Sequence, residues 1–160
     1  MSPRVSRAGI DQRSFRENGF GMKIYIAAPL FCESEKVFNE KTDRILRECG
    51  HETYLPQRDA GCVADLPEFI DGVPSRVFVF REDCRHMDWC DICLILMDGR
   101  VPDEGACFEL SYCYHAGKRC IGYSTDVRSF IDGHANAMLV GSLETVLNNE
   151  AELKDYFSSL

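Results

Sequence analysis

The residues best suited to chemistry are three carboxylic acids around one short apolar segment. Asp83 precedes the segment, and Asp103 and Glu109 follow it. On a helix, the residues three and four positions from Glu109 are small, apolar or aromatic: Gly105, Ala106, Tyr112 and Cys113. A carboxylate in such surroundings loses hydration unless a partner compensates. Glu109 is therefore the first candidate for a functional residue.

Carboxylates beside aromatic side chains suit glycosyl transfer. A carboxylate such as Glu109 can attack an anomeric carbon and hold the sugar covalently. A tyrosine such as Tyr25 can orient it by hydrogen bonding. A second carboxyl group, with a raised pKa, can protonate a departing heterocycle. Phe31 can stack on a planar base, and Gln57 lies in a loop that can reach the same crevice.

Each candidate also has a purely structural interpretation. Asp103 can cap the helix that follows it and favour the helix dipole. Asp83 can be a solvated helix charge, and Tyr25 and Phe31 can be packing residues. For Glu109, the structural interpretation needs a solvated gap in an otherwise apolar helix. The sequence leaves these alternatives open.

Alternating strands and helices must position these side chains. Apolar runs predict strands at residues 23–28, 52–55, 92–97, 119–123 and 143–147. Helices are expected near residues 34–49, 74–89, 103–117, 136–139 and 149–157, with a long polar loop at 56–73. The alternation predicts an α/β fold, a doubly wound parallel sheet with helices on both faces. Ligands of such folds collect at the carboxyl ends of the strands.

Length and composition predict one domain without a membrane span. The 160 residues are 45% hydrophobic and 28% charged, as in soluble globular proteins. Residues 1–21 carry arginine and serine but no apolar core, so we expect a disordered tail before a domain at 22–160. A net charge of −8 argues against binding nucleic acid or an anionic membrane. No apolar run reaches the ~18 residues that a membrane span needs.

The nine cysteines are odd in number and irregularly spaced. We interpret them as free thiols in a reducing compartment, the cytoplasm. The segment from Trp89 to Cys93 resembles a Trp-Cys-x-x-Cys redox motif. It runs from a helix end into a strand, however, whereas a redox cysteine needs a helix N-terminus. Cys84, His86, Cys90 and Cys93 match no standard zinc spacing.

From Lys23 onward the chain resembles the nucleoside 2-deoxyribosyltransferases. The similarity begins with residues 24–31, and Asp83 then stands eight residues before Asp91. Its most specific part runs from Asp98-Gly99 through residues 103–105 to Glu109-Leu110. Residues 136–138 look like the Asn-x-Met segment of the family. The resemblance implies a flavodoxin-like sheet of five parallel strands in three α/β/α layers.

The resemblance also implies an activity suited to nucleotide salvage. Members exchange the base of 2′-deoxyribonucleosides for a free purine or pyrimidine base, by a ping-pong mechanism without metal or organic cofactor. Glu109 matches the nucleophile and Tyr25 the residue that orients it. Asp83 and Asp103 match acids that contact the base and assist its protonation. Ser111 stands where many relatives carry glycine.

The remaining matches concern substrate binding and assembly. Phe31 matches an aromatic residue near the base, and Gln57 a contact to the edge of the base. Asn136, followed by Met138, matches a residue lent to a neighbouring subunit's site, toward the sugar 5′-hydroxyl. The resemblance therefore implies a homo-oligomer with shared active sites. A largely apolar helix around Glu109 leads to the same expectation, because one sheet face cannot cover it all.

Two other functions stay open. The first is hydrolysis, as in the related deoxynucleotide N-hydrolases, with water replacing the acceptor base. A 5′-monophosphate substrate would need cationic contacts, for which Arg128 is the obvious candidate. The second is a nucleoside-binding domain without catalysis, which predicts ligand binding without turnover.

Overall fold

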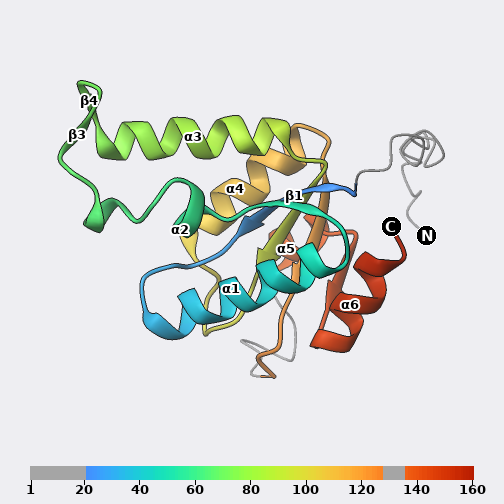
Figure 1. Ribbon diagram of the computed structural model, residues 1–160. Helices are drawn as coiled ribbons and strands as arrows, with labels where there is room; N and C mark the ends of the chain where they lie inside the picture. Colours follow the sequence, from blue (N-terminus) through green and yellow to red (C-terminus); the bar gives the residue numbers. More distant parts are fainter. Residues whose placement is uncertain (1–20, 128–135) are drawn as a thin grey trace.

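The computed structural model describes residues 21–127 and 136–160. Residues 1–20, most of the expected tail, and Arg128 lie outside the described residues. The centre is a five-stranded parallel sheet in the order β2-β1-β5-β6-β7 (Figure 1). Its strands are β1 (Lys23–Ala27), β2 (Glu52–Tyr54), β5 (Ile92–Leu96), β6 (Arg119–Tyr123) and β7 (Thr145–Leu147). The predicted five parallel strands and α/β class are confirmed.

Helices cover both faces of this sheet, which gives the three-layer arrangement expected from the sequence. One face is covered by α1 (Glu33–Glu48) and α6 (Glu150–Ser158), which contact each other. The other is covered by α3 (Ser75–Trp89) and α4 (Glu104–His115), with α5 (Ala137–Ser142) against α4. Gly50 and Gly117, which follow α1 and α4, have positive φ angles of 91° and 77°. They end these helices as the sequence predicts.

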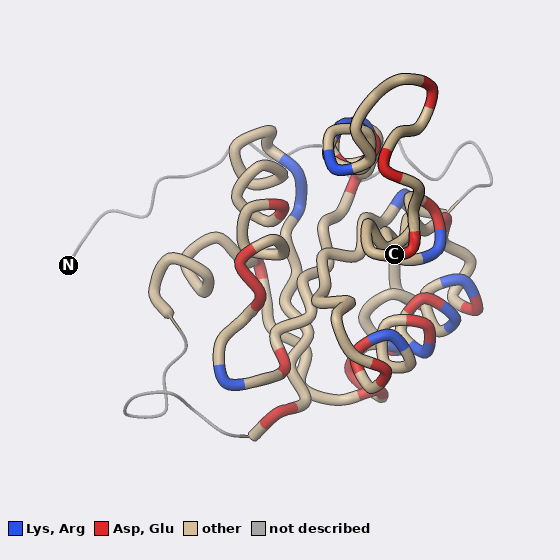
Figure 2. The backbone as a smooth tube through the Cα atoms, turned by 90° about the vertical axis from the view of Figure 1, so that its left-hand side faces the viewer, with Lys and Arg blue, Asp and Glu red and all other residues tan. Residues whose placement is uncertain are grey.

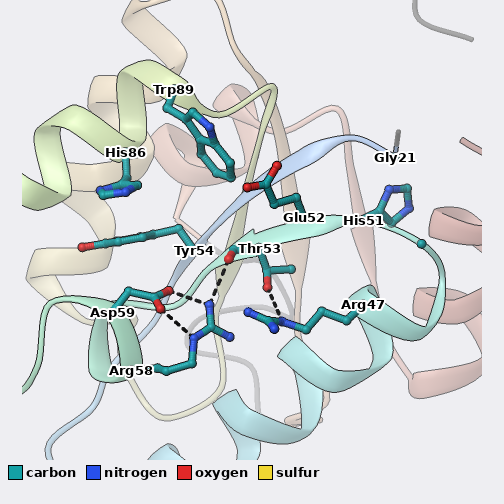
Figure 3. Close-up of a pocket in the computed structure, with 11 residues that line it drawn as sticks. Gly21, Arg47, His51, Glu52, Thr53, Tyr54, Arg58, Asp59, His86 and Trp89 are labelled. Atoms are coloured by element: carbon teal, nitrogen blue, oxygen red, sulfur yellow. Dashed lines mark hydrogen bonds and ion pairs between the residues drawn. The ribbon is translucent and has the colours of Figure 1, made fainter. Parts of the chain in front are cut away.

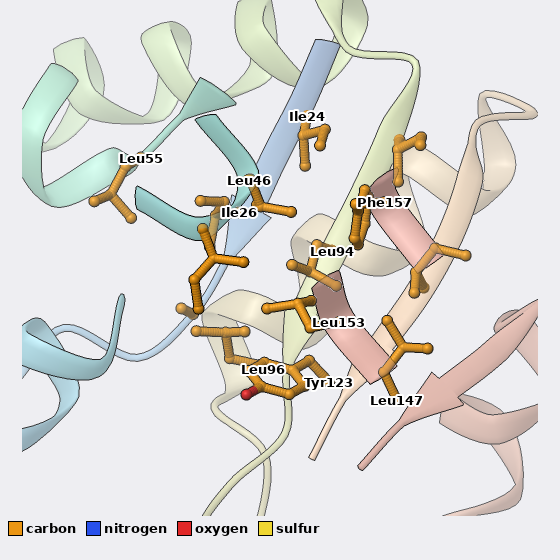
Figure 4. Close-up of a cluster of buried hydrophobic side chains, with 14 residues drawn as sticks. Ile24, Ile26, Leu46, Leu55, Leu94, Leu96, Tyr123, Leu147, Leu153 and Phe157 are labelled. Carbon is orange, nitrogen blue, oxygen red and sulfur yellow. The ribbon is translucent and has the colours of Figure 1, made fainter. Parts of the chain in front are cut away.

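Side-chain alternation along the strands divides the core into two clusters. Ile24 and Ile26 point toward α1 and α6 (Figure 4). Tyr25 and Ala27 point toward α3 and α4. This follows from the period of two in a strand. Tyr25 belongs to the set that faces α3 and α4. Its ring therefore lies on the same side of the sheet as Glu109, which is carried by α4.

The prediction of one long loop at 56–73 is wrong. The segment contains α2 (Pro56–Asp59), a 3₁₀ helix (Val63–Asp65) and a small antiparallel hairpin of β3 (Phe69–Ile70) and β4 (Val73–Pro74). Elements this short carry too few residues for a hydrophobic period to show.

The first of these elements protects the edge of the sheet. Arg58 donates to the Thr53 carbonyl at 2.9 Å, and Asp59 accepts from the Leu55 amide at 2.8 Å. Polar side chains thus form hydrogen bonds with backbone groups in and just after β2, the strand at one edge of the five-stranded sheet. Covering an edge in this way prevents pairing with another chain.

Candidate active site

A hydrogen bond between the sheet and α4 forms the centre of the site. The Tyr25 hydroxyl donates to Glu109 Oε1 at 2.9 Å. Tyr25 is fully buried in the core cluster beneath α4, so its ring cannot move far. It is both a packing residue and the partner of Glu109. This direct contact supports the prediction that the two residues act together.

Glu109 is a partly buried acid with an unusual pKa. Burial raises the pKa of its carboxyl group from 4.5 to about 8. The hydrogen bond from Tyr25 opposes this shift, and the negative charges of Asp83 and Asp103 add to it. The three predicted acids therefore lie close enough to interact electrostatically. Such perturbed acids are typical of functional sites.

Asp83 faces the same region from α3. The Tyr54 hydroxyl donates to Asp83 Oδ1 at 3.0 Å. Burial raises the pKa of Asp83 from 3.8 to about 6, while Tyr54 and His86 oppose the shift. A carboxyl group with this pKa can hold a proton near neutral pH and deliver it to a leaving group. The alternative of a fully solvated helix charge does not fit this burial.

Tyr54 is the residue of this group that sequence reasoning missed. It lies at the end of β2, in register with Tyr25 on β1. Neighbouring parallel strands present register partners on the same face of a sheet. The sequence did predict both strands, at residues 23–28 and 52–55. It did not give their register, so the pairing of Tyr54 with Tyr25 could not be predicted.

Asp103 caps α4, as its structural interpretation predicts. Its side chain accepts from the Ala106 amide at 2.9 Å. The negative charge also contributes to the raised pKa of Glu109. The cap and the expected contact with the base are compatible, because a carboxylate has two oxygens.

Phe31 lies in the loop after β1, and Gln57 lies on α2. Phe31 follows β1 and is 76% exposed, so its ring is free to meet a ligand. The Gln57 amide accepts from Asn39 Nδ2 at 2.9 Å and donates to the Lys36 carbonyl at 3.1 Å. These bonds join α2 to α1, which gives Gln57 a structural role. Their contacts with a base remain predictions.

Asn136 and Met138 open α5. The Asn136 side chain accepts from the Met138 amide at 2.9 Å and so caps the helix. Met138 is 82% exposed. Their hydrogen bond lies within α5, so it does not link them to Glu109. A role at another subunit's site remains a prediction.

Two clefts of the structure have linings that include neither Glu109 nor Tyr25. One, of about 450 Å³, lies at the carboxyl ends of β1 and β5 and is lined by Pro29, Leu96, Asp98 and Thr125, among others. Asp98 accepts from the Thr125 and Asp126 amides there. The other, of about 790 Å³, lies beside β2. The rings of Tyr54, His86 and Trp89 lie on one side of it, opposite Arg47 and Arg58 (Figure 3).

Residues 21–127 and 136–160 contain neither a metal-binding cluster nor a membrane-spanning helix. No group of three or more His, Cys, Asp or Glu side chains there is placed to hold a metal ion. No helix within these ranges combines the length and apolar character of a membrane span.

The raised pKa of Glu109 predicts a pH-dependent change in stability. Between pH 4.5 and about 8 the folded state binds more protons than the unfolded state, so stability falls as pH rises. Glu109→Gln removes the charge and keeps an oxygen for the Tyr25 hydroxyl. We expect its melting temperature to exceed that of the wild type by roughly 4 °C at high pH. The difference should be much smaller at pH 5, just above 4.5, where most of this pH-dependent loss of stability has not yet occurred.

Thermal unfolding at pH 5 and pH 8.5 would measure this effect. Glu104→Gln is the matched control, because Glu104 is exposed in the first turn of the same helix. An equal pH dependence in both variants would contradict the burial of the Glu109 charge.

Comparisons with known proteins point to one enzyme family. A family model described as nucleoside 2-deoxyribosyltransferase matches residues 24–154. A comparison with curated proteins finds no match. The 2-deoxyribosyltransferase of the psychrotolerant bacterium Bacillus psychrosaccharolyticus is 29% identical, with a TM-score of 0.70, covering 84% of this chain and 91% of its own. That of Leishmania mexicana is 19% identical, with a TM-score of 0.62, covering 86% and 97%.

A third solved structure has a related fold. The CMP N-glycosidase of Clostridium botulinum is 19% identical, with a TM-score of 0.56, covering 86% of this chain and 99% of its own. At this identity the likeness shows the fold. The family model, in contrast, matches most of the chain, from β1 into α6. This protein therefore belongs to the nucleoside 2-deoxyribosyltransferases, a family of enzymes that act on nucleosides and bases.

Proposed function

We propose that this enzyme transfers 2-deoxyribose from one nucleobase to another through a covalent ester on Glu109. The hydrogen bond from the buried Tyr25 hydroxyl to Glu109, with Asp83 nearby, is the observation that carries the proposal. A nucleophilic carboxylate needs a fixed orientation and an acid within reach of the leaving group. This group of side chains supports both requirements.

In the first half-reaction, a Glu109 carboxylate oxygen forms a bond to C1′ of the sugar. The bond from C1′ to the base nitrogen breaks, and its electron pair stays with the base. Asp83, whose pKa is about 6, supplies a proton to the departing base. Positive charge that develops on the sugar favours the ionised form of Glu109 at that moment.

The second half-reaction reverses these steps with another base. A nitrogen of the incoming base forms a bond to C1′, and the ester bond breaks to restore the Glu109 carboxylate. The proton on the incoming nitrogen returns to Asp83. No 2′-hydroxyl withdraws electrons from C1′ in a deoxyribosyl group, so both steps pass more easily through an oxocarbenium-like state.

Activity is expected where the two acids together hold one proton. Asp83 has a pKa of about 6 and Glu109 a pKa of about 8, so this state dominates between those pH values. Moving the proton from Glu109 to Asp83 produces the nucleophile and the acid at once. The profile of rate against pH is therefore bell-shaped, with a maximum near neutrality.

The other predicted residues complete the substrate site in this proposal. Phe31 stacks on the base, and Asp103 with Gln57 contacts its edge. The substrates are purine and pyrimidine 2′-deoxyribonucleosides and free bases. All nine cysteines are free thiols, so we place the protein in the cytoplasm, in nucleotide salvage.

Hydrolysis is the second candidate, favoured by the similarity in fold to the CMP N-glycosidase. Water would then take the place of the acceptor base. A 5′-phosphate would need a cationic partner, and Arg128, the residue suggested for this purpose, lies outside the described residues. Because Arg128 is the only obvious candidate that the sequence offers, nucleosides remain the proposed substrates.

Incubation with deoxyinosine and free adenine separates the two activities. Base exchange yields deoxyadenosine and hypoxanthine. Hydrolysis yields free deoxyribose, at a rate that does not depend on adenine. Formation of deoxyribose without deoxyadenosine would overturn the proposal of transfer, and binding of deoxyinosine without either product would favour the non-catalytic alternative.

We further propose a homo-oligomer with shared sites. Charged residues are dense on α1 and sparse on α4 (Figure 2). Large apolar side chains are exposed on the face of α3 and α4: Phe80 is 54% exposed and Phe108 50%, with ring centroids 6.2 Å apart. Burial of such a face against a second copy is favourable. A two-fold interface is the simplest arrangement.

Shared sites predict that activity depends on assembly. Asn136→Ala is expected to lower exchange about tenfold, because the partner's site loses a contact to the sugar 5′-hydroxyl. Dilution should reduce specific activity in step with dissociation, measured by light scattering. Full activity in proven monomers would contradict shared sites.

A further inference from the structure

Three aromatic rings form a column beside the proposed acids. The Tyr54 ring stacks on Tyr25, with centroids 5.4 Å apart and planes 26° apart. His86 stacks on Tyr54, with centroids 3.7 Å apart and planes 12° apart. Figure 3 shows the His86 ring lying over that of Tyr54. Tyr54 is thus held between a strand residue and a helix residue.

The two tyrosines of this column each bond one acid. Tyr25 donates to Glu109 and Tyr54 donates to Asp83, at 2.9 and 3.0 Å. We propose that Tyr54 is a positioning residue, which aims the Asp83 carboxyl group and, through its stack on Tyr25, keeps Glu109 in line with it. This inference rests on the proposed function and adds a residue to it.

The backbone explains why Tyr54 can do this. Tyr25 and Tyr54 are register partners on neighbouring strands, so their side chains leave the same face of the sheet. Tyr54 is only 3% exposed. His86 is fixed in turn, because its Nδ1 lies 2.8 Å from the Glu82 carbonyl oxygen. The column therefore has few alternative conformations, and a small shift of Tyr54 would move both acids.

The charges around the column determine the effect of the Tyr54 hydroxyl. A hydroxyl that donates to a carboxylate favours its ionised form, so this bond lowers the pKa of Asp83. On α3, His86 lowers that pKa further and Glu82 raises it. Removal of the hydroxyl alone leaves these charges in place. The pKa of Asp83 must then rise.

Further charges reach the column from the elements packed against it. The negative charge of Asp59 on α2 raises the pKa of Tyr54. The negative charge of Asp83 in turn raises the pKa values of Glu109 on α4 and of Tyr25 on β1. None of these groups is altered by Tyr54→Phe, so a shift in titration reports the lost hydroxyl group.

Tyr54→Phe is the direct test, because the ring and its stacking remain. The lower apparent pKa of the kcat/KM profile belongs mainly to Asp83, and we expect it to rise by about one pH unit. At the optimum we expect kcat to fall about tenfold, since the acid is less well aimed, with little change in KM. Tyr156→Phe is the matched control. Its hydroxyl bonds Arg119 at 2.8 Å on the face covered by α6, away from the acids.

An unchanged lower pKa in Tyr54→Phe would overturn the inference, even if the rate falls. So would an equal shift in Tyr156→Phe. A measurement without turnover separates this inference from the proposed function: carbon-13 NMR titration of labelled aspartate side chains, with Asp83 assigned through Asp83→Asn. If the Asp83 signal shifts upward in Tyr54→Phe but the wild type exchanges no bases, only the proposed function fails. If the wild type is active and the signal does not move, only the positioning role fails.

Discussion

Glu109→Gln is expected to lower base exchange by ~10⁴-fold or more while the fold stays intact. The amide keeps the size of the side chain and an acceptor for the Tyr25 hydroxyl, which donates to Glu109 Oε1 at 2.9 Å. It cannot form the ester with C1′, because a neutral amide is a poor nucleophile. The result is measured as the rate of deoxyadenosine formation from deoxyinosine and adenine.

Two controls accompany the measurement on Glu109→Gln. Glu104→Gln changes an exposed acid on the same helix and should leave the rate within about twofold. Thermal unfolding of Glu109→Gln should remain cooperative. A folded variant with a near-normal rate would contradict the nucleophile assignment. It would favour the non-catalytic binding domain, for which Glu109 is dispensable.

The second large effect is expected for Asp83→Asn, which should lower exchange by about 10²- to 10³-fold. The amide cannot protonate the departing base. Loss of the Asp83 charge also lowers the pKa of Glu109, since that charge helps to raise it to about 8. The remaining activity should therefore rise with pH and level off, because ionisation of Glu109 becomes the main requirement.

The leaving group and a matched variant test this interpretation. A deoxynucleoside whose base departs readily as an anion should lose less activity in Asp83→Asn than one whose base needs a proton. Asp88→Asn is the control, because Asp88 lies on the same helix and accepts from the Tyr112 hydroxyl at the same distance, 3.0 Å, but is exposed. If Asp83→Asn kept a bell-shaped profile of rate against pH, another acid would have to supply the proton. Asp103 would then be the next candidate.

The sequence was sufficient to predict the sheet and to pair Tyr25 with Glu109. Strand runs such as residues 92–97 are almost entirely apolar, which is typical of parallel strands buried on both faces. Glu109 stood out because its helical neighbours carry no charge. Tyr25 was paired with Glu109 because a tyrosine can orient a carboxylate and because the family resemblance implies that role, and the bond between the two residues agrees with that pairing.

Other features depend on relations between distant segments, which a sequence pattern does not contain. The register that pairs Tyr54 with Tyr25 joins two strands separated by α1. The hydrogen bonds of Gln57 to α1 depend on how α2 packs, and α2 itself was hidden in a predicted loop. The proposed contact of Asn136 with another subunit depends on an interface that one chain does not display.

Mass spectrometry of the enzyme after incubation with a slowly reacting 2-fluoro nucleoside tests the central claim most directly. We expect the mass to increase by one fluorinated pentosyl group, with the label on the peptide that contains Glu109. The label should be absent in Glu109→Gln and should disappear when an acceptor base is added. Release of the base from wild-type enzyme with no adduct, or an adduct on another residue, would contradict the proposed covalent mechanism.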